Sequence, residues 1–102
     1  MAETSNSNGS HAEPPPQVRE LVGEEVVLDV ASTFVFIGTL KRVGHDWLVL
    51  VEADVHDLRD TQTTREKYLL ACREHGISRN RTSVWVAMRE VVGISRLSDI
   101  VA

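Results

Sequence analysis

The alternation of hydrophobic and polar residues is clearest in the middle of the chain. Residues 34–43 and 47–55 are rich in β-branched, aromatic and aliphatic side chains, and a short polar segment, residues 44–46, separates them. Two such runs joined by a short break that contains glycine are typical of an antiparallel β-hairpin. The first run is apolar on both faces at its start, which predicts a strand covered on both sides. The second run becomes polar at Glu52 and Asp54, and we expect both side chains to face solvent.

A glycine interrupts the first of these strands. Gly38 stands inside the run, where a side chain would normally pack. Glycine within a strand usually marks a bulge or a close approach of two backbones, because the missing Cβ leaves room for either. A sharp bend in a strand is also how a small sheet closes into a barrel. We therefore predict a curved sheet with its bend at Gly38.

Shorter alternating patterns predict three more strands. Residues 24–31 and 83–89 alternate in hydrophobicity, and in the second of these Val84 and Val86 share one face while Trp85 lies on the other. Residues 90–95 form a last strand, linked so tightly to the one before that both can be read as one bent ribbon. Five strands are therefore expected.

Two segments have the features of helices. Apolar residues at positions 18, 21 and 22, followed by Gly23, predict an amphipathic helix of about two turns after the prolines. Thr63 as N-cap, Glu66 reaching back to it, and Gly76 after the last turn predict a helix over residues 64–75. This second helix is inserted between the third and fourth strands.

Length and composition limit the organisation of the chain. Its 102 residues suit one domain, and residues 1–16 are so poor in apolar side chains that we expect a disordered tail. The net charge of −4 argues against general DNA binding and against an anionic membrane surface. A single cysteine, Cys72, excludes an intrachain disulfide, and no apolar run approaches the about 20 residues that span a bilayer. We expect a cytoplasmic protein.

The order of elements and three short motifs resemble the Sm-like (LSm/Hfq) family. Residues 38–43, Gly-Thr-Leu-Lys-Arg-Val, with Phe36 before them and Leu50 on the next strand, look like the first half of the Sm motif. Residues 23–26 look like the family's entry into its first strand, and residues 86–92 are similar to the second half of the motif.

This resemblance implies a mainly β fold. The expected architecture is a five-stranded, strongly bent antiparallel Sm-like (SH3-type) barrel over residues 17–102, with a short N-terminal helix and a helical insertion at residues 56–82. It also implies a homo-oligomeric ring, a hexamer or heptamer, and an association with RNA.

The chain departs from the family pattern in the loops that bind RNA. Gly44 stands where the family has Asp, and Leu48 stands where it has Asn. Arg89 is kept in the second loop, but Glu90 replaces a glycine. An Asn side chain both donates and accepts hydrogen bonds at a base edge, whereas Leu does neither. The resemblance therefore implies the fold and the ring more strongly than it implies RNA.

The candidate RNA or ligand site follows from these loops. It consists of His45, Asp46, Trp47 and Arg89, in which Trp47 would stack on a base and Arg89 would contact a phosphate. The favoured alternative is a simple hairpin turn, with Trp47 in the barrel core and Arg89 paired to Asp46 or Glu90.

A second candidate surface would join subunits or partners. Open strand edges favour pairing with another copy, and the last two strands are apolar. The residues of this surface are Arg79, Arg81, Val84, Val86, Val92 and Ile94. The basic residues of the insertion either form an anion-binding rim or, as we favour, pair with nearby acidic residues such as Asp57, Asp60 and Glu66.

Metal binding and catalysis find little support. The densest group of potential ligands is Asp54, His56, Asp57, Asp60, Cys72 and His75. It lacks the spacing of known zinc motifs, and no nucleophile or phosphate-binding motif is present. We expect no metal, no cofactor and no enzyme. The predicted function is a non-enzymatic oligomeric binding module associated with RNA; the alternative is a ring that binds no RNA and docks a protein partner on its inserted helix.

Overall fold

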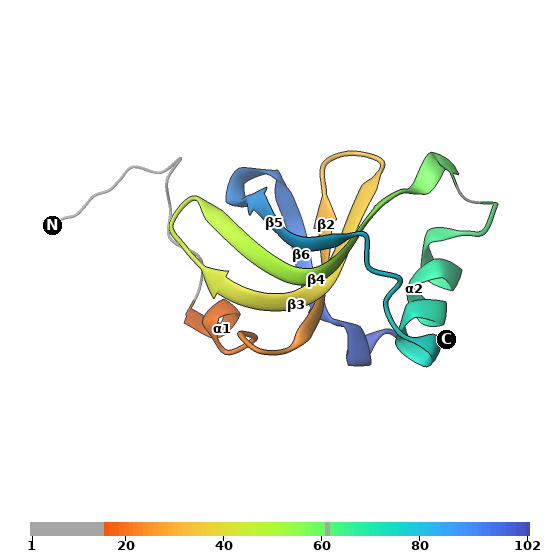
Figure 1. The fold of residues 1–102 in the computed structure, drawn as a ribbon, viewed down its shortest axis with the longest axis horizontal. Helices are drawn as coiled ribbons and strands as arrows, with labels where there is room; N and C mark the ends of the chain where they lie inside the picture. Colours follow the sequence, from red (N-terminus) through yellow and green to blue (C-terminus); the bar gives the residue numbers. More distant parts are fainter. Residues whose placement is uncertain (1–15, 61) are drawn as a thin grey trace, which may run out of the picture.

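The computed structural model describes residues 16–60 and 62–102. Its single sheet is antiparallel, with the strand order β5-β4-β3-β2-β6 (Figure 1). The strands are β2 (Glu25–Val30), β3 (Phe34–Val43), β4 (Trp47–Asp57), β5 (Arg81–Ala87) and β6 (Val91–Arg96). The helices are α1 (Pro16–Arg19) and α2 (Arg65–His75), with short 3-10 turns η2 (Leu58–Asp60), η3 (Met88–Glu90) and η4 (Leu97–Asp99). The five predicted strands and the inserted helix are confirmed. The tail predicted for residues 1–16 lies outside the described residues except for Pro16.

The bend of the sheet lies where Gly38 was expected to place it. The pairing of β3 with β4 shifts between Ile37 and Thr39, so one residue of β3 faces two of β4. Glu52, in the bulge, has a left-handed φ of 50°. A Cβ on Gly38 would lie 2.9 Å from the Cβ of Ala53, closer than real contacts allow. Glycine is needed here because the two strands approach too closely for any side chain, and both strands curve strongly (Figure 1).

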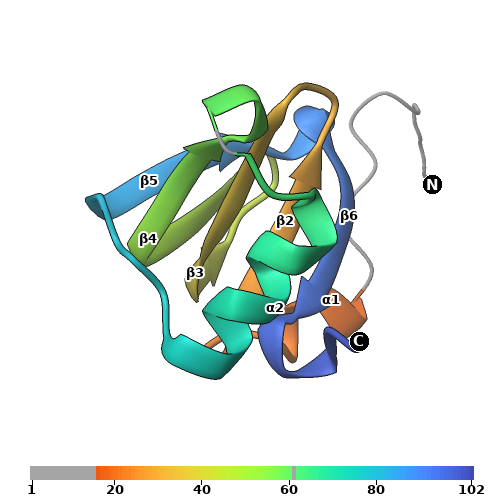
Figure 2. The same cartoon turned by 90° about the vertical axis from the view of Figure 1, so that its right-hand side faces the viewer.

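Apolar side chains on the two faces of the sheet form two separate cores. The larger core includes Val26, Leu28, Leu40 and Leu50 on the inner face of the curved sheet. The smaller one lies on the opposite face, where Leu69 and Cys72 of α2 and Leu97 of η4 pack on Val27, Val35 and Ile37. Figure 2 shows α2 crossing in front of the sheet at this place. The prediction that β3 is covered on both faces is confirmed.

The bulge changes which side chains of β4 point inward. Leu48 and Leu50 belong to the larger core, but beyond the bulge Ala53 does so instead. Asp54 is thereby turned to the face covered by α2, where it pairs in register with Ile37 and is only 2% exposed. The prediction that Asp54 faces solvent is wrong, because one extra residue inverts the alternation that follows it.

The helix ends differ from the predictions by small amounts. α1 has a single turn, because the chain then joins β3: the Gly23 N–H donates to the Leu40 carbonyl at 2.8 Å, with φ of 95° at Gly23. The N-cap of α2 is Thr64, whose hydroxyl accepts from the Lys67 N–H at 3.2 Å, so Thr63 is not the cap. Gly76 ends α2 as predicted. In the described part of the chain, neither helix is long and apolar enough to cross a membrane.

Candidate functional site

Two turns that are far apart in sequence meet at one end of the sheet. The turn between β3 and β4 is closed by a hydrogen bond from the Gly44 N–H to the Trp47 carbonyl at 2.8 Å. The Met88 N–H of η3 donates to the Asp46 carbonyl, also at 2.8 Å. Since Trp47 and Ala87 are paired across β4 and β5, this contact extends the sheet pairing into the two turns. We call residues 44–47 together with η3 the two-turn site.

All four predicted ligand residues belong to this site. The side chains of His45 and Asp46 are 45% and 62% exposed and lie 3.1 Å apart, a contact that is ionic when His45 is protonated. Arg89 is 86% exposed, with its Nε 3.9 Å from a carboxylate oxygen of Glu90. Trp47 is 46% exposed, so the alternative that places it in the barrel core is wrong. The pairing of Arg89 with Glu90 in that alternative is present as a long, solvent-exposed contact.

The residues that depart from the Sm pattern cannot replace the missing polar groups. Leu48 is 1% exposed and packs in the larger core, so its side chain faces away from any ligand at the turn. Gly44 has no side chain, and an added Cβ would lie 3.2 Å from the Trp47 carbonyl oxygen. The two-turn site therefore offers an indole, an imidazole, a carboxylate and a guanidinium, but no amide for reading a base edge.

A second exposed tryptophan lies beside the site. Trp85 of β5 is 56% exposed, and its ring centroid lies 6.3 Å from that of Trp47 in an edge-on arrangement. The guanidinium of Arg42 lies over the Trp85 ring, 5.4 Å from its centroid. Arg42 and Trp85 were not predicted as site residues. The alternation of β5 already placed Trp85 opposite the buried Val86, which is the signal that could have identified it.

The predicted subunit surface is only partly available to a neighbour. Both β5 and β6 are edge strands among the described residues. Val92 is 72% exposed, but Val86 is 4% exposed in the larger core, so only its backbone can contact another copy. Val84 and Ile94 are half-buried against the same core. Arg79 forms an ion pair with Glu52, and Arg81 donates to the Asn80 carbonyl at 3.0 Å.

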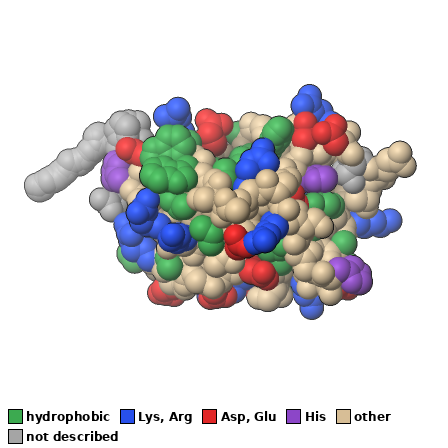
Figure 3. Space-filling model, viewed as in Figure 1, with side chains coloured by type: hydrophobic (Ala, Val, Ile, Leu, Met, Phe, Trp, Pro, Cys, Tyr) green, Lys and Arg blue, Asp and Glu red, His purple; other side chains and the backbone are tan. Residues whose placement is uncertain are grey.

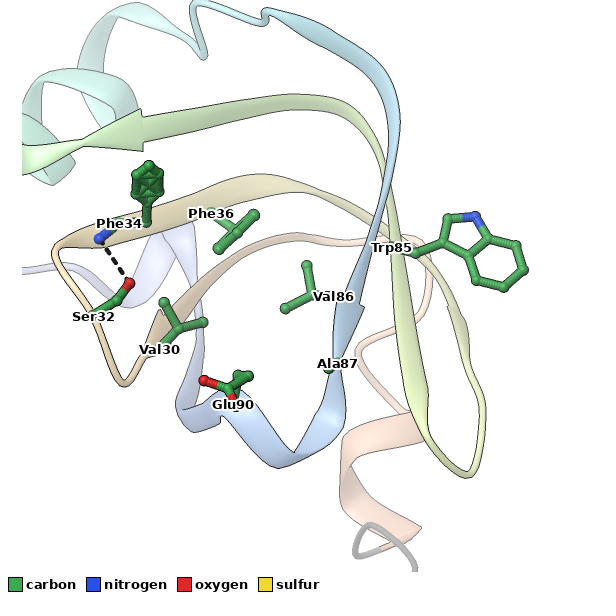
Figure 4. A pocket seen from close by; sticks show the side chains of 8 residues that line it. All are labelled: Val30, Ser32, Phe34, Phe36, Trp85, Val86, Ala87 and Glu90. Carbon is green, nitrogen blue, oxygen red and sulfur yellow. Dashed lines mark hydrogen bonds between the residues drawn. The ribbon is translucent and has the colours of Figure 1, made fainter.

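A cavity of about 200 Å³ opens on the inner side of the sheet, between the β2–β3 turn and β5. Figure 4 shows Val30, Phe36 and Val86 pointing toward one another there, while the indole of Trp85 points away on the other side of β5. The residues that line it are Val30, Ser32, Phe34, Phe36, Trp85, Val86, Ala87 and Glu90. The lining is mainly apolar and lies beside an edge strand.

The polar residues under α2 form a hydrogen-bonded group. The Tyr68 hydroxyl and the Asn80 amide, the latter at 3.2 Å, both donate to the Asp54 carboxylate. His56 stacks on Tyr68 with ring centroids 4.1 Å apart. Burial, and then the hydrogen bond to Asp54, raise the pKa of Tyr68 well above its usual range. Burial raises the pKa of the Cys72 thiol as well.

Several charged residues of the insertion form ion pairs. Arg65 contacts Asp29 and Glu66, and Arg59 contacts Asp57 at 2.7 Å. Hydrogen bonds from Arg59 hold the pKa of Asp57 well below its usual range. The described residues contain no group of three His, Cys, Asp or Glu side chains placed to hold a metal ion. Of the four arginines predicted to pair with acidic residues, Arg65 and Arg79 do so, whereas the guanidinium groups of Arg73 and Arg81 donate to the backbone carbonyls of Ile100 and Asn80.

The comparisons with known proteins bear on the fold. Neither the protein-family models nor the curated proteins give a match. Among solved structures, the chain is similar to the Pyrococcus abyssii Sm protein in complex with a uridine heptamer. The two share 18% sequence identity with a TM-score of 0.56, and the similarity covers 82% of this chain and 99% of that chain. The chain thus has the Sm-like fold, with α1 before the sheet and α2 as an insertion between β4 and β5.

Proposed function

We propose that the protein is a non-enzymatic, oligomeric Sm-type module that binds single-stranded RNA at the two-turn site. The observation that carries this proposal is the hydrogen bond from Met88 to Asp46, because it brings the exposed Trp47 and Arg89 to the same end of the sheet. The choice of ligand is supported by the Sm protein of similar fold, which is in complex with a uridine heptamer.

Each exposed side chain of the site has a role in this proposal. The Trp47 indole stacks on an unpaired base, which is a contact that every base can make. The Arg89 guanidinium contacts a phosphate, since this side chain is 86% exposed at the same end of the sheet. Because Leu48 is buried and cannot read a base edge, we expect binding that depends on salt and discriminates little between bases.

The oligomer rests on the two edge strands. β5 and β6 are consecutive strands that lie at opposite ends of the strand order, so each leaves one row of backbone donors and acceptors without a strand partner among the described residues. Pairing of β5 of one copy with β6 of the next satisfies both rows and repeats around a closed ring. Val92, 72% exposed on β6, is an apolar residue that such pairing would cover. A hexamer or heptamer would contain six or seven two-turn sites, one from each subunit.

The absence of catalysis is also part of the proposal. Cys72, the one thiol of the chain, is 5% exposed and its pKa is raised by burial, so its thiolate form is disfavoured. Asp54 is occupied by two donors, Tyr68 and Asn80. These groups have the partners of a structural network rather than the access that a reacting group requires.

A ring that binds no RNA and docks a protein partner on α2 is the second candidate. One observation favours it: the position at which the family has a base-reading Asn is filled here by the buried Leu48. The charged outer side of α2, with Glu66, Lys67 and Glu74 exposed, would then face the partner.

Binding of fluorescently labelled poly-U and poly-A over a salt series separates the two candidates. We expect micromolar affinity for both at low salt, falling as salt rises, and a loss of about tenfold in Arg89→Ala. Lys67→Ala is the matched control, because it removes the same charge from α2, which lies at the other end of the molecule from the β3–β4 turn (Figure 1). No binding at low salt would remove the RNA proposal and favour the protein-docking ring.

A further inference from the structure

We infer that the RNA-contacting surface continues beyond the two-turn site, across the outer face of β3, β4 and β5, to Trp85 and Arg42. This inference rests on the proposed function, since it assigns a second contact to the same ligand. We call Arg42, Trp47 and Trp85 the aromatic surface. Trp47 belongs to both, because it follows the β3–β4 turn and its ring meets that of Trp85.

The register of the strands fixes this surface. Arg42 pairs with Val49, and Val49 pairs with Trp85, so the three residues form one row across three strands on the same face. Val49 is 5% exposed although it belongs to neither core, which places it beneath its larger neighbours in the row. In this row the buried Val49 side chain supports the Trp85 indole and the Arg42 guanidinium, which lie above it.

Two properties of the aromatic surface are suited to binding single-stranded RNA. Both indoles expose about half of their area, which is unusual for the largest apolar side chain. Arg42 is exposed and lies over the Trp85 ring, and its chain neighbour Lys41 is exposed as well, in a chain whose net charge is −4. Figure 3 shows hydrophobic side chains with Lys and Arg side chains beside them at this end of the molecule. Local cations with exposed aromatic rings fit phosphates and unstacked bases.

The position of Arg42 over the Trp85 ring indicates how the RNA strand would lie on this surface. Arg42 is held over the Trp85 ring in the unbound protein, so a phosphate can contact it without a new side-chain arrangement. A base stacked on Trp47 at the turn and a following base on Trp85 are then contacts of one continuous strand. The indole of Trp85 points away from the apolar cavity (Figure 4), so the inner side of the barrel takes no part.

The chain provides its own reporters for this inference. It contains two tryptophans, and both lie in the aromatic surface. In the full chain, Trp47→Phe leaves Trp85 as the sole indole, and Trp85→Phe leaves Trp47. Oligouridine is titrated into each variant while tryptophan emission is recorded, and binding is measured in parallel by anisotropy of labelled oligouridine. We expect saturable quenching of the remaining indole in both variants, at the concentration at which anisotropy saturates.

The outcomes separate this inference from the proposed function. Binding by anisotropy with quenching of Trp47 and none of Trp85 would overturn the extended surface and leave the two-turn site in place. Binding that disturbs neither indole would overturn the extended surface too, and absence of binding at low salt would overturn both. Trp85→Leu should weaken binding about tenfold, and Arg42→Gln should lower the slope of log affinity against log salt by about one, while Lys67→Gln should change neither. Unchanged affinity and slope in Trp85→Leu and Arg42→Gln would contradict the inference.

Discussion

The Tyr68 hydroxyl of α2 donates a hydrogen bond to the Asp54 carboxylate of β4. This contact joins the inserted helix to the sheet at Asp54, whose carboxylate is the one buried among the described residues. Asn80, which precedes β5, donates to the same group and also binds both backbone polar groups of Val55. A single hydrogen-bond network therefore connects the inserted helix, the end of β4 and the residue that precedes β5.

Removal of the Tyr68 hydroxyl should destabilise the whole domain. Tyr68→Phe keeps the ring that stacks on His56 but takes one of two donors from Asp54. We expect a loss of about 1.5–3 kcal/mol in the free energy of unfolding, because the hydrogen bond is made to a buried charged group. Urea denaturation measures it, with His75→Gln on the exposed side of the same helix as control. Equal denaturation midpoints for Tyr68→Phe and the wild type would disprove this role.

Stability should decline at alkaline pH. Burial raises the pKa of Tyr68 and of Cys72 in the folded protein. Groups with raised folded pKa values stabilise the fold below their unfolded pKa values, and this contribution is lost as the pH rises from those values through the folded ones. The decline should therefore begin above about pH 8.5, where an ordinary thiol ionises.

A thiol-free variant tests that pH dependence. Cys72→Ala should lose less unfolding free energy than the wild type between about pH 7 and pH 10, although it starts from a lower value because a buried side chain is shortened. Urea denaturation at the two pH values gives the comparison. A decline in the variant as large as in the wild type would show that Cys72 does not contribute.

The close approach of β3 and β4 at Gly38 makes a further prediction. Gly38→Ala places a Cβ 2.9 Å from the Ala53 Cβ and 3.1 Å from the Val51 carbonyl oxygen, so the strands must separate. We expect a loss of about 1–3 kcal/mol, as for other overpacked interiors, measured by thermal or urea unfolding. Gly93→Ala is the control, because its added Cβ meets only Asp29 atoms at 3.5 Å and beyond. Similar stabilities of the two variants would refute the tight approach.

The edge of β6 predicts how assembly responds to charge. Val92 is 72% exposed, so Val92→Lys should fold normally as a monomer but disfavour burial against a neighbouring copy. Light scattering should give six or seven times the chain mass of 11.4 kDa for the wild type and a smaller mass for the variant. Lys67→Val, the reverse exchange on α2, should leave the mass unchanged. A monomeric wild type would rule out the ring.

The sequence predicted the parts of the fold that depend on simple periodicity. The bounds of β3, the bend at Gly38 and the end of α2 at Gly76 all follow from local patterns or from glycine's conformational freedom. The burial of Asp54 could not be read in the same way. It depends on an extra residue in β4, accommodated by a positive φ at Glu52, and no residue type in that strand signals it.

The candidate site could be predicted from the sequence only in part, because some of its contacts depend on how the strands are paired. Motif positions identified the two turns, and their contact through Met88 and Asp46 follows once the sheet is formed. The neighbourhood of Trp85 and Arg42 depends on the register of three strands, which single-strand patterns do not specify.

Photocrosslinking tests the central claim most directly. A photoreactive oligouridine is bound to the wild-type protein at low salt, irradiated, and the attached residues are identified by mass spectrometry. The proposed function predicts adducts in residues 44–47 and 88–90, and the extended surface adds residues around Trp85. Adducts confined to α2 would contradict RNA binding at the two-turn site. An unchanged yield of adducts at residues 44–47 and 88–90 in Arg89→Ala would contradict it as well.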